Sequence, residues 1–156
     1  MSVGIVIPCF NEKQNLTAVF EKCLEFDDAR VIFVFVDNGS NDGSWTLISD
    51  FIERESRIFG LRLSENAGYG GGIRAGIEFL DNFTGLEIMG WCHADFQTDI
   101  NDISKGLKIM DVDPTVFLCK GVRIERPLVD TMFSKFMAVV ASVVTARKFK
   151  EINAQP

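Results

Sequence analysis

Several features that mark other classes of protein are scarce or missing in this chain. It contains no run of lysine and arginine, and its formal net charge is -6. Both observations argue against a nucleic-acid polymer as partner, because such a partner is bound by a basic stripe. The four cysteines are widely spaced and form no CxxC pair. This spacing indicates reduced, buried thiols in a cytoplasmic protein rather than a disulfide framework or a zinc site.

The hydrophobic segments noted in the sequence are short. Residues 1–4 have neither the charged region nor the cleavage site of a signal peptide. The uncharged run over residues 136–146 is far below the roughly 20 residues that a membrane-spanning helix requires. The chain has 156 residues, of which 47% are hydrophobic. This length and composition predict about one domain with a real core.

Apolar runs alternate with amphipathic stretches along the first 120 residues, which predicts a mostly parallel sheet with right-handed helical crossovers. Helical periodicity follows each of the first four apolar runs. Pro8 is expected to end the first strand, and Asn11 to cap the following helix, with Gln14 completing a capping box. Strands are predicted at residues 3–7, 31–36, 58–63, 86–91 and 115–119, and the strand at 86–91 is expected to be buried.

Polar or glycine-rich clusters follow the first four predicted strands. Ligands of parallel α/β sheets bind outside the carboxyl ends of the strands. Four loops therefore converge on one edge of the predicted sheet, which is the strongest argument from the residues for a binding site. The clusters are residues 8–12, 37–44, 66–72 and 93–99.

The last of these clusters carries candidate metal ligands. His93, Asp95 and Gln97 occupy alternate positions, and alternate side chains of an extended segment point the same way. A hard cation such as Mg²⁺ is held by one or two carboxylates together with substrate phosphates. The alternative is a polar strand end with an aspartate that caps the next helix.

The second and third clusters suggest nucleotide contacts, each with a simpler alternative. Asp37 ends a buried strand, where it can accept hydrogen bonds from a base or ribose, or serve as a turn residue. The glycine loop at 66–72 can bring backbone N–H groups to a phosphate, or be a flexible turn. Arg74 can neutralise phosphate or be solvated. A dinucleotide-binding interpretation is weak, because the G-x-G-x-x-A pattern follows the third strand rather than the first.

Four segments, in this order, resemble those of the family 2 glycosyltransferases of GT-A fold. Residues 6–12 (VIPCFNE) resemble the opening strand and turn of that family, and residues 36–44 resemble its V-D-D-G-S-x-D-G-[ST] segment. Residues 66–76 resemble its glycine-rich helix start, and residues 93–97 (HADFQ) the D-A-D-x-Q form of its DxD motif. The dolichyl-phosphate-mannose-synthase-like subgroup is the most similar, and residues 120–126 and 151–156 also resemble its segments.

The resemblance implies an α/β fold of the GT-A (Rossmann-like) type, a three-layer α/β/α architecture around a mostly parallel sheet. It implies transfer of a sugar, with inversion, from a nucleotide-diphosphate-sugar donor to an acceptor such as a polyprenyl phosphate. The implied cofactor is a divalent metal, Mg²⁺ or Mn²⁺, held by Asp95 and Gln97. Arg123 and Arg126 would meet phosphate and act with Asp95 in catalysis. The implied nucleotide-binding residues are Pro8, Asn11, Glu12, Asp37, Gly68, Arg74 and Ala94.

The chain departs from the family pattern in two places. His93 stands where the motif has its first aspartate; it is a candidate third metal ligand, but we favour a role as hydrogen-bond partner. The chain also ends at Pro156, whereas family members continue. We therefore expect a C-terminally truncated enzyme, with a nucleotide-sugar-binding core at 1–128 and the start of an acceptor-side segment at 129–156.

The segment at 132–146 is predicted to form a helix that is apolar on all sides. Burial within the chain or in a homodimer is the favoured interpretation. The alternative is a helix on the inner face of a membrane, next to Lys148 and Lys150. A non-catalytic donor-binding, dimerisation or membrane-surface module on the same fold is the second functional hypothesis. A nucleotidyltransferase ranks third, because residues 8–11 contain neither glycine nor arginine.

Overall fold

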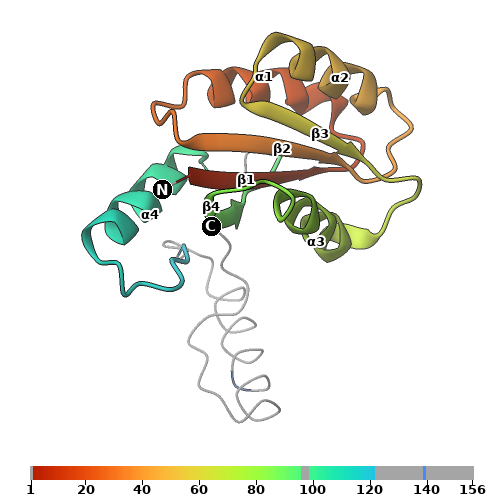
Figure 1. The fold of residues 1–156 in the computed structure, drawn as a ribbon. Coiled ribbons are helices and arrows are strands. Elements are labelled where there is room, and N and C mark those ends of the chain that lie inside the picture. The colour runs from red at the N-terminus through yellow and green to blue at the C-terminus, as the bar shows by residue number, and fades with distance from the viewer. Residues whose placement is uncertain (1, 96–98, 122–138, 140–156) are drawn as a thin grey trace. The chain divides into compact units, whose positions relative to one another are not determined.

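The computed structural model describes residues 2–95, 99–121 and 139. Its four strands form one parallel sheet in the order β3-β2-β1-β4. Helices α1 and α2 cover one face of this sheet and α3 covers the other (Figure 1). The predicted three-layer α/β/α architecture is confirmed. The elements are β1 (Ser2–Cys9), α1 (Lys13–Leu24), β2 (Val31–Asp37), α2 (Ser44–Arg54), β3 (Ile58–Arg62), α3 (Gly68–Leu80), β4 (Leu86–Trp91) and α4 (Asn101–Val112).

By its internal contacts the chain divides into two compact units, residues 1–105 and 106–156. The whole sheet belongs to the first unit. The predicted boundary at residue 128 lies outside the described residues and stays a prediction. Among the residues that the structure describes, no helix has the length and apolar character needed to cross a membrane.

The core lies on the two central strands, β1 and β2. Both strands are apolar almost throughout, and from Phe33 to Asp37 every residue of β2 is buried. Such continuous apolar runs are expected where helices cover both faces of a parallel sheet. On one face the rings of Phe20 and Phe51 stack with centroids 4.0 Å apart, and Phe51 also meets Phe35 of β2. This packing joins α1 and α2 over the sheet.

On the other face, α3 approaches the sheet through a glycine. A Cβ atom on Gly76 would lie 2.4 Å from Cγ1 of Val6 and 3.0 Å from Cγ2 of Val36. Any larger residue would push the helix away from these two fully buried valines. Gly76 therefore holds the helix that follows the glycine loop close to the strands.

Strand β1 continues through Pro8 to Cys9, so the prediction that Pro8 ends the strand was wrong. Pro8 pairs with Val36 of β2. On the opposite side, β4 reaches only as far as Trp91, which pairs with Val6, and Cys92 then donates to the Val6 carbonyl. The backbone N–H and C=O groups of successive residues in a strand point alternately toward its two neighbouring strands. Those of Pro8 point toward the β4 side, where β4 has already ended. Its missing N–H costs no ladder hydrogen bond there.

Two further predictions about strands require correction. β4 is only partly buried, and its Met89 is 36% exposed. The strand lies at the edge of the sheet, because among the described residues β4 pairs with β1 alone. Residues 115–119 form no strand. A turn occupies this position instead: Asp113 accepts hydrogen bonds from Thr115 through its side chain and from Val116 through its carbonyl. Without a neighbouring strand in the described residues, the apolar run at 115–119 has no ladder to join.

The cysteines largely match the prediction of reduced, buried thiols. None of the four forms a disulfide, and Cys9, Cys23 and Cys92 are buried while Cys119 is half-buried. Burial raises the pKa of the Cys92 thiol to about 12 and also raises the pKa values of Cys9 and Cys23. These thiols therefore stay protonated at neutral pH and act as small apolar groups.

Candidate functional site

The four polar clusters meet at the carboxyl edge of the sheet, as the sequence predicted. The ends of β1 and β2 are level, because Cys9 pairs with Asp37. A cleft of about 310 Å³ opens at this edge. Every one of the four loops contributes to its wall. The lining residues are Pro8, Cys9, Phe10, Glu12, Asn38, Asn66, Gly68, Tyr69, His93, Ala94 and Asp95.

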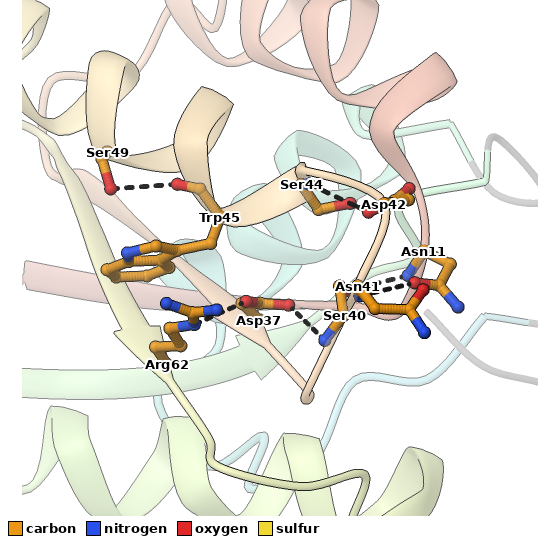
Figure 2. Close-up of polar contacts among 9 residues, drawn as sticks. All are labelled: Asn11, Asp37, Ser40, Asn41, Asp42, Ser44, Trp45, Ser49 and Arg62. Carbon is orange, nitrogen blue, oxygen red and sulfur yellow. Dashed lines mark hydrogen bonds and ion pairs between the residues drawn. The ribbon is translucent and has the colours of Figure 1, made fainter.

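Asp37 lies at the end of β2 with its side chain fully buried. Its Oδ1 accepts a hydrogen bond from the backbone N–H of Ser40 at 3.0 Å. Its Oδ2 lies 3.4 Å from Nε of Arg62 but makes no hydrogen bond among the described residues (Figure 2). The distance gives a charge contact without the alignment of a hydrogen bond. A buried carboxylate oxygen left in this state costs about 1–3 kcal/mol, which a hydrogen-bond donor on a ligand would recover.

A second hollow, of about 350 Å³, is lined by Gly39, Ser40, Arg62, Leu63 and Ser64, of which Ser40 and Arg62 contact Asp37. The Arg62 side chain is 54% exposed. Its guanidinium lies 5.7 Å from the ring centroid of Trp45, within the range of a cation–π contact. Arg62 is thus held between an aromatic ring and a carboxylate at the mouth of the site.

The loop after β1 is fixed by the loop after β2, and the predicted capping box at Asn11 and Gln14 does not form. Asn11 takes a left-handed conformation with φ of 55°, and no side chain of its own segment caps α1. Instead, the backbone N–H of Asn11 donates to Oγ of Ser40, and Oδ1 of Asn11 accepts from the backbone N–H of Asn41. Periodicity along one segment cannot reveal these partners, because they lie about 30 residues away.

Asp42 caps two helices at once. Its Oδ2 accepts from the backbone N–H of Lys13 at the start of α1. Its Oδ1 accepts from N–H and Oγ–H of Ser44 at the start of α2 (Figure 2). Desolvation opposes ionisation of Asp42, but the hydrogen bonds from Ser44 and Lys13 outweigh it and lower the pKa of the carboxyl. One carboxylate therefore joins the end of the loop after β1 to the end of the loop after β2.

The glycine loop is held by the amide of Asn38, which is 3% exposed. The amide nitrogen of Asn38 donates to the carbonyl of Gly68, and its oxygen accepts from N–H of Ala67, both at 2.9 Å. The N–H of Gly68 donates to Oδ1 of Asn66. Two of the N–H groups that a phosphate was expected to use are therefore already bonded. Gly68 itself has φ of 75°, which favours glycine, and open space lies beside it.

A chain of three polar side chains links the glycine loop to the segment after β4. The hydroxyl of Tyr69 lies 3.2 Å from Nε2 of His93, and the two rings are stacked with centroids 5.1 Å apart. Nδ1 of His93 lies 3.7 Å from Oδ1 of Asp95. Burial, with smaller contributions from Cys92 and Asp95, raises the pKa of Tyr69 to about 12. The phenol therefore keeps its proton at neutral pH.

Half of the predicted site residues line one cleft. Pro8, Glu12, Gly68, Ala94 and Asp95 line the cleft, and so does His93. Asn11 and Asp37 are next in sequence to lining residues and are not themselves among them. Arg74 does not line the cleft either: its side chain is 79% exposed and pairs with Glu78 one turn along α3. Gln97, Arg123, Arg126 and the predicted helix at 132–146 lie outside the described residues, apart from Val139.

Asn38, Arg62 and Tyr69 contact other residues of the site but were not singled out from the sequence. Asn38 follows Asp37 directly and stands where the family pattern has a second aspartate. Arg62 is the charged residue at the end of an otherwise apolar strand, which is a signal that could have been used. Tyr69 is the single tyrosine of the chain and lies inside the glycine loop, where an aromatic residue is not needed for a turn.

The described donor set fits a divalent cation only in part. Among the described residues, no group of three His, Cys, Asp or Glu side chains is placed to hold a metal ion. Asp95 does present a carboxylate to the cleft. A single carboxylate together with phosphate oxygens is a common way of holding Mg²⁺. The site therefore fits a metal that arrives with a diphosphate better than a metal bound by protein alone.

Comparison with known proteins agrees with this geometry. Residues 4–154 match the model of Glycosyl transferase family 2. The chain is 34% identical over 110 residues to the uncharacterized glycosyltransferase YkoT of Bacillus subtilis. This alignment covers 64% of this chain and 32% of that protein. It is 27% identical over 85 residues to dolichyl-phosphate beta-glucosyltransferase of Dictyostelium discoideum, covering 48% of this chain and 26% of that protein.

Solved structures show the same fold. The mannosyltransferase PcManGT from Pyrobaculum calidifontis, solved in complex with GDP-Man and Mn²⁺, aligns with a TM-score of 0.60 at 23% identity, covering 73% of this chain and 33% of that chain. TarS of S. aureus in complex with UDP-GlcNAc aligns with a TM-score of 0.59 at 15% identity, covering 72% and 32%. The chain thus spans about a third of the length of these proteins. The matched family model, extending over nearly the whole sequence, shows that the chain belongs to glycosyl transferase family 2.

Proposed function

We propose that this chain forms the donor-binding part of an inverting glycosyltransferase that takes its sugar from a nucleotide-diphosphate donor. The observation that carries the proposal is the Asp37 carboxylate, buried at the end of β2 with one oxygen lacking a hydrogen bond among the described residues. A ring N–H of a base, or a ribose hydroxyl, would supply the missing donor. The adjacent hollow beside Arg62 offers the space for such a group.

The diphosphate and sugar would occupy the cleft between the glycine loop and the segment after β4. Asp95 would hold a divalent metal there, with Gln97 as a further candidate ligand. When bound, the metal would offset the negative charge that grows on the leaving nucleoside diphosphate. Pro8, Glu12, Gly68 and Ala94 shape the walls of this cleft. Arg123 and Arg126 would add positive charge on the phosphate of donor or acceptor.

The acceptor is proposed to be a polyprenyl phosphate. Two relatives are named for such substrates: a dolichyl-phosphate beta-glucosyltransferase and the undecaprenyl-phosphate 4-deoxy-4-formamido-L-arabinose transferase of Aeromonas hydrophila, which is 35% identical over 80 residues. A phosphate acceptor is already an anion, so it needs little help from a general base. Reaction would then take place at the cytoplasmic surface of a membrane, where the lipid carrier lies.

Calorimetry with UDP-, GDP- and CDP-sugars in the presence of Mn²⁺ tests the proposal. The chain is expected to bind at least one donor, and Asp95→Ala is expected to weaken that binding at least about tenfold, since a charged ligand to the metal is lost. Asp50→Ala, at an exposed aspartate on α2, is the matched control and should bind as the wild type does. Failure to bind any of the three donors would refute the proposed function.

A further inference from the structure

The only tyrosine and the only histidine of the chain contact each other in the cleft. Tyr69 comes from the glycine loop at the start of α3, and His93 follows β4. Their rings are nearly parallel, with an interplanar angle of 12°. The pair therefore ties two loops of the site together across the cleft wall.

Both ring nitrogens of His93 face protein groups. Nδ1 lies 3.7 Å from Oδ1 of Asp95, which is a charge contact rather than a hydrogen bond. Nε2 lies 3.2 Å from the Tyr69 hydroxyl, within hydrogen-bond distance. Burial raises the pKa of Tyr69, so the phenol keeps its proton and can donate it in a hydrogen bond. The side chain of His93 is only 13% exposed, so neither nitrogen is turned toward open solvent.

We propose that His93 is a positioning residue that, together with Tyr69, fixes the Asp95 carboxylate in the cleft, and that it is not a metal ligand. This inference rests on the proposed function, because it concerns the metal of the donor site. His93 stands where the family motif has an aspartate, and its two ring nitrogens face Tyr69 and Asp95.

One consequence concerns the order of binding. Because His93 stands where the family motif has an aspartate, the segment after β4 offers one carboxylate fewer, and the protein alone attracts a divalent cation weakly. A nucleoside diphosphate brings the missing oxygen ligands and negative charge. The metal therefore binds tightly only as a complex with the nucleotide.

Electron paramagnetic resonance of Mn²⁺ tests both parts of the inference on tag-free protein. Binding is measured from the loss of the hydrated Mn²⁺ signal, with and without UDP or GDP. The wild type should take up little Mn²⁺ alone and at least about tenfold more with nucleotide present. In the ternary complex, protein labelled with ¹⁵N at its single histidine should show no hyperfine coupling between Mn²⁺ and that label.

Two substitutions separate positioning from ligation. Tyr69→Phe keeps the ring stack but removes the hydroxyl, and should weaken Mn²⁺-dependent nucleotide binding by about threefold to tenfold, the loss of one hydrogen bond. If His93 were a ligand, releasing Nε2 would leave that affinity unchanged or raise it. His93→Asp should allow Mn²⁺ to bind without nucleotide. Glu78→Gln, at an exposed position of α3, is the control and should leave both binding curves unchanged.

The results distinguish failure of the inference from failure of the proposed function. Hyperfine coupling to the labelled histidine, or tight Mn²⁺ binding by the free wild type, would overturn the inference while nucleotide binding still stands. Absence of nucleotide binding by the wild type, with or without Mn²⁺, would overturn the inference together with the proposed function on which it rests.

Discussion

Replacing Asp37 by asparagine separates a binding role from a structural one, because the two roles predict opposite outcomes. The substitution keeps the size of the side chain, and the amide oxygen can still accept from N–H of Ser40. It removes the charge from a fully buried site and puts an amide N–H₂ where Oδ2 now lies without a hydrogen bond among the described residues. A ligand N–H that needs an acceptor at this point would meet a donor instead.

The expected magnitudes follow from the contacts. Loss of a hydrogen bond to a charged group costs about 1.5–3 kcal/mol, so nucleotide affinity should fall by about tenfold to a hundredfold. Folding should be little affected. The lost contact with the half-exposed Arg62 is worth less than about 1 kcal/mol after solvent screening, and the buried carboxylate was itself costly. The free energy of unfolding should therefore change by no more than about 1 kcal/mol.

Calorimetric titration with UDP and GDP in the presence of Mn²⁺, together with urea unfolding, provides both quantities. Asp50→Asn on α2 is the matched control, since it makes the same chemical change at an exposed position. Fluorescence of Trp45, next to Arg62, offers an independent signal of nucleotide binding. An Asp37→Asn variant that unfolds about 3 kcal/mol more easily, yet binds nucleotide normally, would show that Asp37 is a structural cap and refute the reasoning.

Two further predictions concern the scaffold of the site. Asp42→Ala should lower the free energy of unfolding by about 1–2 kcal/mol at neutral pH, because two helix N-termini lose their cap. The pKa of Asp42 is lowered in the folded state, so its contribution to stability is present above the pKa of the unfolded chain and is lost as pH falls through the folded pKa. The difference in free energy of unfolding between variant and wild type should therefore shrink in acid. A difference that stays constant with pH would contradict this. Gly76→Ala should cost about 1–3 kcal/mol in the same assay, because the new methyl group meets Val6. Gly70→Ala, where a Cβ would meet no atom within 4 Å, should not destabilise the protein, and equal losses for the two alanines would exclude close packing as the cause.

The parts of the fold that were predictable depend on patterns within single segments. Apolar runs and helical periodicity located all four strands of the sheet and the four helices that follow them. Errors arose where a distant partner decides the outcome. Pro8 stays in β1 because of where β4 ends, and α1 is capped by Asp42 of another loop. The run at 115–119 has strand-like residues but no neighbouring strand among those described.

The site, like the fold, was predictable in its position but not in the contacts between distant residues. Its position followed from topology, since loops after parallel strands must meet at one edge. The resemblance to a family supplied the individual residues, and Glu12, Gly68 and Asp95 do line the cleft. It could not supply Arg62 or the contact of Tyr69 with His93, which depend on side-chain directions in this chain. The exposed pair of Arg74 with Glu78 likewise required coordinates.

The ties between the loops have a consequence for how the protein acquires its binding capacity. Asn11 with Ser40, Lys13 with Asp42 and Asn38 with Gly68 each join positions 29 or 30 residues apart. Each tie thus connects one strand–helix unit to the next, and no single unit can preorganise the pocket. A nascent chain should gain nucleotide affinity late and abruptly, when the third unit and the segment after β4 have both docked. Changes at the start of α1 should then alter nucleotide affinity at Asp37 through the contact between Lys13 and Asp42.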